Sequence, residues 1–201
     1  MRPSAHIYRA SPAPAKSSLR QGEILSNIRR FRIDPNTLGT DNPGIQFALH
    51  DFAIVLTQDC DLEQDFKVRS AGNRSDKLLP NVLFCNLAKA EDLRGTAATT
   101  GISSDMWKRI SQNKDERYHF LQAVDGSCDA QQIGLPELGL DFKRYFTLPT
   151  DELYHRIDSG EAKRRCILVS PYLEHLSNRF AHFLCRVALP EDHLSEPAAL
   201  G

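Results

Sequence analysis

The chain has 201 residues, of which 41% are hydrophobic and 25% charged, and its formal net charge is −1 at pH 7. These values are typical of one globular domain, and the near-zero charge excludes a bulk electrostatic preference for nucleic acid or membrane. The five cysteines are widely spaced without a CxxC pair, which excludes a zinc knuckle and a disulfide framework. No apolar segment is long enough to span a bilayer, so we expect a cytoplasmic protein with reduced thiols and no membrane contact.

The composition of the two ends differs from that of the rest of the chain. Residues 1–19 are rich in Pro, Ala and Ser and predict a flexible tail, and 195–201 predict a second one. Between them, 20–194 predict a single α+β domain. Its expected parts are a β core, a mixed insertion and C-terminal helices, at 20–90, 91–149 and 150–190.

The first half of the domain predicts mainly β structure joined by polar loops. Residues 22–33 indicate a strand that continues into an irregular basic stretch, and 45–57 indicate a second strand. The turn residues Asp34-Pro35-Asn36 separate them. A polar loop is expected over 63–77, followed by a third strand over 78–87.

The middle of the chain predicts a mixture of short elements. Helices are expected at 88–94 and 104–112, strands at 117–124 and 140–148, and a further helix capped by Thr150 or Asp151 that runs through Ile157. Ser103 or Ser104 is the expected cap of the second of these helices, because a serine side chain accepts the free backbone N–H groups there.

The last helix is the clearest element of the sequence. Ser170 is a good N-cap residue, and Pro171 fits the first helical position. Apolar side chains then recur at helical spacing and form one face. We therefore expect Phe180 and Phe183 to be buried, with the basic side chains of the helix exposed.

Two groups of basic residues are candidates for nucleic-acid binding, because arginine binds phosphate through paired hydrogen bonds. The first group lies on one face of the last helix at steps of four, three and four: His175, Arg179, His182 and Arg186. The second group is interleaved with apolar residues of a predicted strand: Arg29, Arg30 and Arg32. The alternative for both groups is a solvated surface whose charges contribute little.

Two carboxylates flank a thiol where the second strand is expected to end, at Asp59-Cys60-Asp61. If the strand remains extended, Asp59 and Asp61 share a side and suit a divalent cation such as magnesium. The alternative is that both acids cap the following turn. Cys60 is a candidate nucleophile, although flanking carboxylates disfavour the thiolate. His119, in a predicted strand, completes the candidate catalytic residues.

Three segments of the first half carry a family resemblance: Gly22-Glu23-Ile24, Ala53-Ile54-Val55-Leu56-Thr57 and Val82-Leu83-Phe84-Cys85. Their order resembles the opening of MazF/PemK-like proteins, over residues 20–90. The resemblance implies a small SH3-like β barrel, and the family's best-known members are toxins that cleave single-stranded RNA without a metal. Two departures put cleavage in question, since Asp51-Phe52 replaces the family's Arg-Pro and Ala88 stands near the place of its hydroxyl residue.

The sequence thus predicts an α+β protein with a small SH3-like barrel, additional strands and C-terminal helices packed on it. The leading functional expectation is a barrel that binds RNA or another single-stranded nucleic acid, with catalysis left open. The alternative is a non-enzymatic adaptor that binds a protein partner in a bacterial defence or toxin–antitoxin-like system. A third hypothesis is a metal-dependent hydrolase that uses Asp59 and Asp61. No cofactor is expected other than a candidate divalent cation.

Overall fold

The structure is a computed structural model that describes residues 6–12, 17–73, 75–95 and 101–185. Within these residues the strands are β1 (Tyr8–Ala10), β2 (Glu23–Ile33), β3 (Ile45–Val55), β4 (Asn81–Lys89), β5 (Tyr118–Leu121), β6 (Leu138–Pro149) and β7 (Lys163–Leu168). The helices are α1 (Asp59–Ser70), α2 (Ala90–Arg94), α4 (Ser104–Ser111), α5 (Thr150–Asp158) and α6 (Tyr172–Leu184). Two short 3-10 turns, η3 (Pro35–Thr37) and η4 (Gly126–Cys128), complete the elements.

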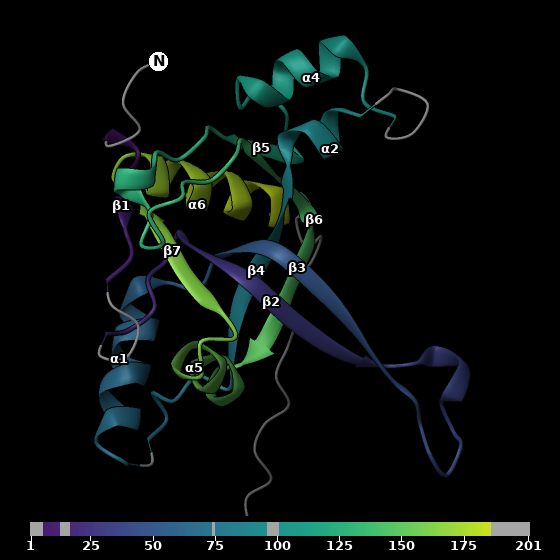
Figure 1. Ribbon diagram of the computed structural model, residues 1–201, viewed down its shortest axis with the longest axis vertical. Coiled ribbons are helices and arrows are strands. Elements are labelled where there is room, and N and C mark those ends of the chain that lie inside the picture. The colour runs from purple at the N-terminus through teal and green to yellow at the C-terminus, as the bar shows by residue number, and fades with distance from the viewer. Residues whose placement is uncertain (1–5, 13–16, 74, 96–100, 186–201) are drawn as a thin grey trace, which may run out of the picture.

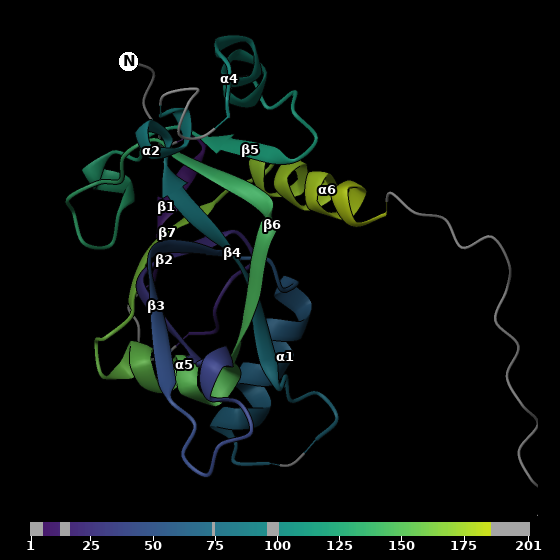
Figure 2. The same cartoon turned by 90° about the vertical axis from the view of Figure 1, so that its right-hand side faces the viewer.

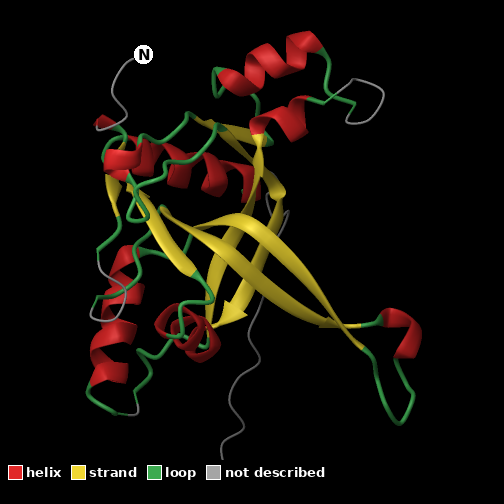
Figure 3. Ribbon diagram, in the orientation of Figure 1, coloured by secondary structure: helices red, strands yellow, loops and turns green. Residues whose placement is uncertain are grey.

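The seven strands form one antiparallel sheet in the order β1-β7-β2-β3-β4-β6-β5 (Figure 3). The α+β class predicted from the sequence is therefore confirmed. The sheet is open, because β1 and β5 lie at its two ends and do not pair with each other within the described residues. The closed SH3-like barrel implied by the family resemblance is not confirmed.

Helices cover both faces of the sheet. Neighbouring residues of a strand point to opposite faces, so Ile24 and Leu25 belong to two separate hydrophobic clusters. Phe180 of α6 packs into the cluster of Ile24, whereas Leu62 of α1 and Leu153 of α5 pack into the cluster of Leu25. Figures 1 and 2 both place α6 near β5, and α5 and α1 toward the opposite end of the molecule.

Strands β2 and β3 extend well beyond the rest of the sheet. Within β2, only residues 23–26 pair with β7, and within β3, only residues 52–55 pair with β4. Farther along, β2 and β3 pair with each other alone, from Ile28 opposite His50 to Ile33 opposite Ile45. We call residues 28–50 the arm, and Figure 1 shows it projecting from the body and ending at η3.

The described parts of the N-terminal stretch, residues 6–12 and 17–19, correct the expectation of a flexible tail over residues 1–19. Strand β1 pairs with β7 at the edge of the sheet, and the side chain of Tyr8 is fully buried. The Tyr8 hydroxyl donates a hydrogen bond of 3.0 Å to the carbonyl oxygen of Gln122. Leu19 is also fully buried, in the cluster of Leu25. The predicted tail at 195–201 lies outside the described residues.

Helix α1 replaces most of the polar loop expected over residues 63–77, so that prediction is wrong. The helix has almost no hydrophobic periodicity, since Leu62 is its only fully buried apolar residue. Polar contacts fix it instead. The buried carboxylate of Asp65 accepts hydrogen bonds from the side chain of Arg69, 2.9 Å away, and from the backbone N–H of Leu79, 2.7 Å away. A pattern search for apolar residues misses such a helix.

The C-terminal helices were predicted correctly except at their first residues. Helix α6 starts at Tyr172 after Pro171 as its N-cap residue, so Ser170 is not the cap. Phe180 is buried as expected, and Phe183 is partly buried against the same cluster. Helix α4 is capped as predicted, because the Ser103 hydroxyl accepts the N–H of Met106.

Candidate functional site

The arm has two faces that differ in chemistry, as the register of β2 and β3 determines. One face carries the cross-strand pairs Phe31–Phe47, Ile33–Ile45 and Arg29–Leu49. The other carries Ile28–His50, Arg30–Ala48 and Arg32–Gln46. We call the first the apolar face, for its residues Phe31, Ile33, Ile45, Phe47 and Leu49, and the second the polar face.

Three arginines of the arm present their guanidinium groups to solvent. Arg29, Arg30 and Arg32 are all exposed, and none of them forms an ion pair with a carboxylate among the described residues. Arg32 donates a 3.2 Å hydrogen bond to the Gln46 side chain, and the guanidinium of Arg30 lies 5.6 Å from the ring centre of Phe146. These contacts orient two of the groups while leaving most of their N–H donors available.

The apolar face is exposed to an unusual degree for large hydrophobic side chains. Phe31 is 52% exposed, Phe47 66% and Ile45 74%, and Ile33 and Leu49 are each half exposed. The Phe31 and Phe47 rings meet edge to face with centroids 6.5 Å apart, and the Arg156 guanidinium lies 5.0 Å from the Phe31 ring centre. A contiguous exposed apolar surface is typical of a binding site.

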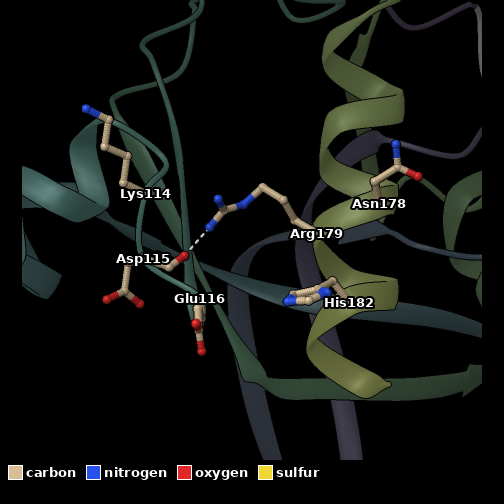
Figure 4. Close-up of a pocket in the computed structure, with 6 residues that line it drawn as sticks. All are labelled: Lys114, Asp115, Glu116, Asn178, Arg179 and His182. Atoms are coloured by element: carbon tan, nitrogen blue, oxygen red, sulfur yellow. Dashed lines mark hydrogen bonds between the residues drawn. The ribbon is translucent and has the colours of Figure 1, made fainter. Parts of the chain in front are cut away.

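The basic residues expected on one face of α6 do not form a single exposed surface. The side chain of Arg179 turns toward the loop before β5 and donates hydrogen bonds to the backbone carbonyls of Asn113, Asp115 and Tyr118. Figure 4 shows it reaching from α6 toward Asp115. The expectation that Arg179 is exposed is therefore wrong, because its side chain is half-buried and its donors are engaged by these carbonyl groups.

The other basic residues of α6 also fail to form one surface. His175 is exposed at the helix surface but its ring lies 5.4 Å from that of His119. His182 is exposed, and Arg186 lies outside the described residues. The pocket beside the helix has a volume of about 220 Å³ and mixed charge, as its lining shows (Figure 4): Lys114, Asp115, Glu116, Asn178, Arg179 and His182. Carboxylates in this pocket disfavour an anionic ligand.

Asp59 is the first residue of α1, so the extended strand end expected here is absent. Its carboxylate accepts two hydrogen bonds from the guanidinium of Arg20, at 2.9 and 2.7 Å, and one from the backbone N–H of Gln21 at 2.7 Å. Partial burial alone raises the pKa of Asp59, but these hydrogen bonds and the Arg20 charge outweigh it and hold the pKa below its ordinary value. Asp59 thus fixes the segment before β2 to α1.

Asp59 and Asp61 do not share a side. Residues two apart on a helix are rotated by about 200° from each other, which separates the two carboxylates. Asp61 lines a cavity of about 590 Å³ between α1 and α6, while the exposed thiol of Cys60 lies 3.6 Å from the Asp61 carboxylate. No cluster of three or more His, Cys, Asp or Glu residues suited to a metal occurs in the part of the chain that the structure describes.

His119 is buried in β5 and has the environment of a neutral imidazole. Burial lowers its pKa from 6.5 to about 3, and the nearby positive charges of Arg179 and His175 act in the same direction. Its Nδ1 atom has no hydrogen-bond partner. An imidazole with this pKa stays neutral near neutral pH, so His119 is a weak general base.

Sequence reasoning missed two buried arginine–carboxylate pairs and a third that is only partly buried. Arg164 pairs with Glu23 at 2.6 Å, and Arg165 pairs with Asp129 at 2.8 Å, all four side chains being almost completely buried. The third pair joins Arg117 to Asp141 between β5 and β6. We expected no strand at β7, although the apolar run that follows Arg165 is the signal of one.

No protein-family model matches this chain, and no curated protein matches it. Among the described residues, no helix is long and apolar enough to cross a membrane. Of the two basic groups, only the one on the arm has all its arginines exposed among the described residues, with Arg30 and Arg32 on the same face.

Proposed function

We propose that this protein binds RNA or another single-stranded nucleic acid through the arginines of its arm. The observation that carries the proposal is that Arg29, Arg30 and Arg32 are exposed on one projecting ribbon and lack carboxylate partners among the described residues. Guanidinium groups without such partners are available for bidentate contacts with phosphate.

The shape of the arm supports this proposal. A two-stranded ribbon that projects from the body can follow a nucleic-acid backbone that a flat surface would contact at only one point. Arg30 and Arg32 lie on the polar face, so their contacts with phosphate do not require the rings of Phe31 and Phe47 on the apolar face. Contacts with phosphate carry no direct information on base identity, so we expect little sequence preference.

The relationship to MazF/PemK-like proteins stays a prediction, and so does the SH3-like barrel that it implies. The proposed role does not require cleavage, which accords with the departures of this chain from the family at Asp51-Phe52 and Ala88. A metal-dependent hydrolase has less support, because the carboxylate of Asp59 is occupied by Arg20 and diverges from Asp61.

Salt-dependent binding of a fluorescent single-stranded RNA tests the proposal. Each phosphate contact adds about 0.7 to the slope of log affinity against log salt for single strands, so Arg30→Gln/Arg32→Gln should lower the slope by about 1.4. A matched control removes two exposed positive charges of the α1 region with Lys67→Gln/Lys77→Gln and should leave the slope unchanged. Equal slopes in both variants, or no binding by the parent at low salt, would contradict the proposal.

A non-enzymatic adaptor is the second candidate, and the apolar face of the arm is the observation that favours it. Aliphatic side chains such as Ile33 and Ile45 have no evident role against phosphates, whereas they are common at the centre of protein interfaces. If Arg30→Gln/Arg32→Gln has no effect on RNA binding and the parent captures a protein through Phe47, the adaptor replaces the nucleic-acid proposal.

A further inference from the structure

We infer that the apolar face of the arm is the interface of a homodimer, in which two arms stack face to face and antiparallel about a twofold axis. This inference is independent of the proposed function, because it depends on the apolar face and nucleic-acid binding depends mainly on the polar face. The occupant is a second copy of this chain.

Among the described residues, nothing covers the apolar face of the arm apart from one contact with the body. A two-stranded ribbon is marginally stable in water, and within the described part of the chain no third strand pairs with this one beyond residues 26 and 52. On the apolar face, the guanidinium of Arg156, from α5 of the body, contacts the Phe31 ring. Phe47 and Ile45 remain 66% and 74% exposed. Stacking against a second apolar surface would bury these side chains.

The pattern of the face is self-complementary under twofold symmetry. The aromatic pair Phe31–Phe47 lies midway between the Ile33–Ile45 pair near the tip and Leu49 near the body. A twofold axis through the aromatic pair places the Ile33–Ile45 pair of one copy over the Arg29–Leu49 pair of the other, so that Ile45 meets Leu49 and Ile33 meets the aliphatic stem of Arg29. An isologous interface requires this property.

Charge along the arm favours the antiparallel arrangement. Arg29 flanks the apolar face near the body, and Asp34 follows it at the tip, with Asp41 in the connecting loop. Antiparallel stacking brings Asp34 of one copy toward Arg29 of the other, twice per dimer. A parallel arrangement would place like charges together, which costs free energy.

The available area agrees with a weak but specific dimer. A large apolar side chain has about 200 Å² of surface, so five that are half to three-quarters exposed offer about 500 Å² per copy. The pair then buries about 1,000 Å², before the flanking arginines and backbone are counted, close to the lower end of specific interfaces. We therefore expect dissociation in the micromolar range.

Sedimentation velocity between about 1 and 200 μM protein tests the inference, since a micromolar dimer changes its population across this range. The parent should shift from monomer to dimer, and Phe47→Asp should remain monomeric at all concentrations. Phe47 is mostly exposed, so an unchanged melting temperature will show that Phe47→Asp folds. Arg29→Glu should weaken the dimer, and Arg29→Glu/Asp34→Arg should restore it, because the charges exchange places.

Three outcomes would overturn the inference: a parent that stays monomeric at every concentration, a dimer that survives Phe47→Asp, or a charge reversal without rescue. A monomeric parent whose apolar face binds a different protein would assign the face to another occupant. The proposed function is tested separately with Arg30→Gln/Arg32→Gln, which alters the polar face and should leave the dimer intact. Either proposal can therefore fail while the other stands.

Discussion

Individual buried side chains of this protein show how the environment, rather than residue type, decides a role. Arg164 is a core residue that donates to both carboxylate oxygens of Glu23 and to the backbone carbonyls of Ser17 and Ser18. A buried guanidinium needs all these acceptors, since each unmet donor costs free energy. Which acceptors lie near an arginine depends on the fold, so the sequence alone does not distinguish a buried arginine from a surface one.

His119 makes the stability of the protein depend on pH. Its folded-state pKa, about 3, lies below its ordinary value of 6.5, so between these values the unfolded chain binds the additional proton. The contribution is complete above pH 6.5 and is lost as the pH falls. We expect the free energy of unfolding, measured with urea, to decrease from pH 7.5 to pH 5, and to decrease less in His119→Gln.

Exposed His182 provides the control for this measurement. His182→Gln makes the same substitution at an exposed position and shows what the loss of a histidine costs outside the buried site. His175, whose pKa is also lowered by burial and by Arg179, contributes in the same direction and leaves a residual slope in His119→Gln. A slope identical in parent and His119→Gln would show that the buried imidazole is not the proton-linked group.

At the scale of elements, α6 holds the loop before β5 through one side chain. Arg179→Ala removes a donor to three backbone carbonyls, so we expect a loss of about 2–3 kcal/mol in the free energy of unfolding. Arg179→Lys should recover only part of it, because one ammonium cannot reproduce the guanidinium fork. His182→Ala, on the same helix, should change stability by less than about 0.5 kcal/mol.

Chemical denaturation measures these losses, and hydrogen exchange locates them. Increased exchange at Tyr118 and Phe120 of β5 in Arg179→Ala is the expected signature. A loss in Arg179→Ala no larger than that in His182→Ala would mean that Arg179 is a surface charge after all, as the sequence suggested.

The elements predicted best from the sequence are those with periodic apolar residues. Helix α6 and the strands around Ile54 and Phe84 follow this rule, since they bury a regular stripe or a continuous run. Helix α1 does not, because a polar contact of Asp65 replaces the apolar stripe. The cation site expected at Asp59 and Asp61 depended on this error, because two acids that share a side on a strand diverge on a helix.

At the scale of the whole molecule, the sheet divides into a body and an arm. The arginines of the arm were recognised from the sequence, but their projection from the body was not. Projection depends on where β7 and β4 stop pairing, at residues 26 and 52, and these are long-range contacts. Local patterns cannot encode this limit, so the same alternation of arginine and apolar residues was compatible with a half-buried strand.

This division predicts that the arm can be removed without unfolding the body. Joining Ile28 to His50 through an Asn-Gly turn keeps the buried Ile28 and the stack of His50 on Phe146, whose ring centroids are 4.3 Å apart. The body loses the contacts of Arg156 with Phe31 and with the carbonyl of Arg29, and the contact of Arg30 with the Phe146 ring, while Arg156 keeps its ion pair with Glu152. We therefore expect the free energy of unfolding to change by about 1 kcal/mol or less.

Circular dichroism and urea denaturation of the armless protein measure this change, and sedimentation and RNA binding follow in the same samples. Retained stability together with loss of both dimer and RNA binding is the expected result, since both proposed surfaces lie on residues 28–50. An armless protein that fails to fold would instead make the arm part of the folding unit, and the exposed apolar face would then belong to the stability of each chain. A folded armless protein that still binds RNA would place the binding surface on the body, where α6 does not supply it because Arg179 is engaged with backbone carbonyls.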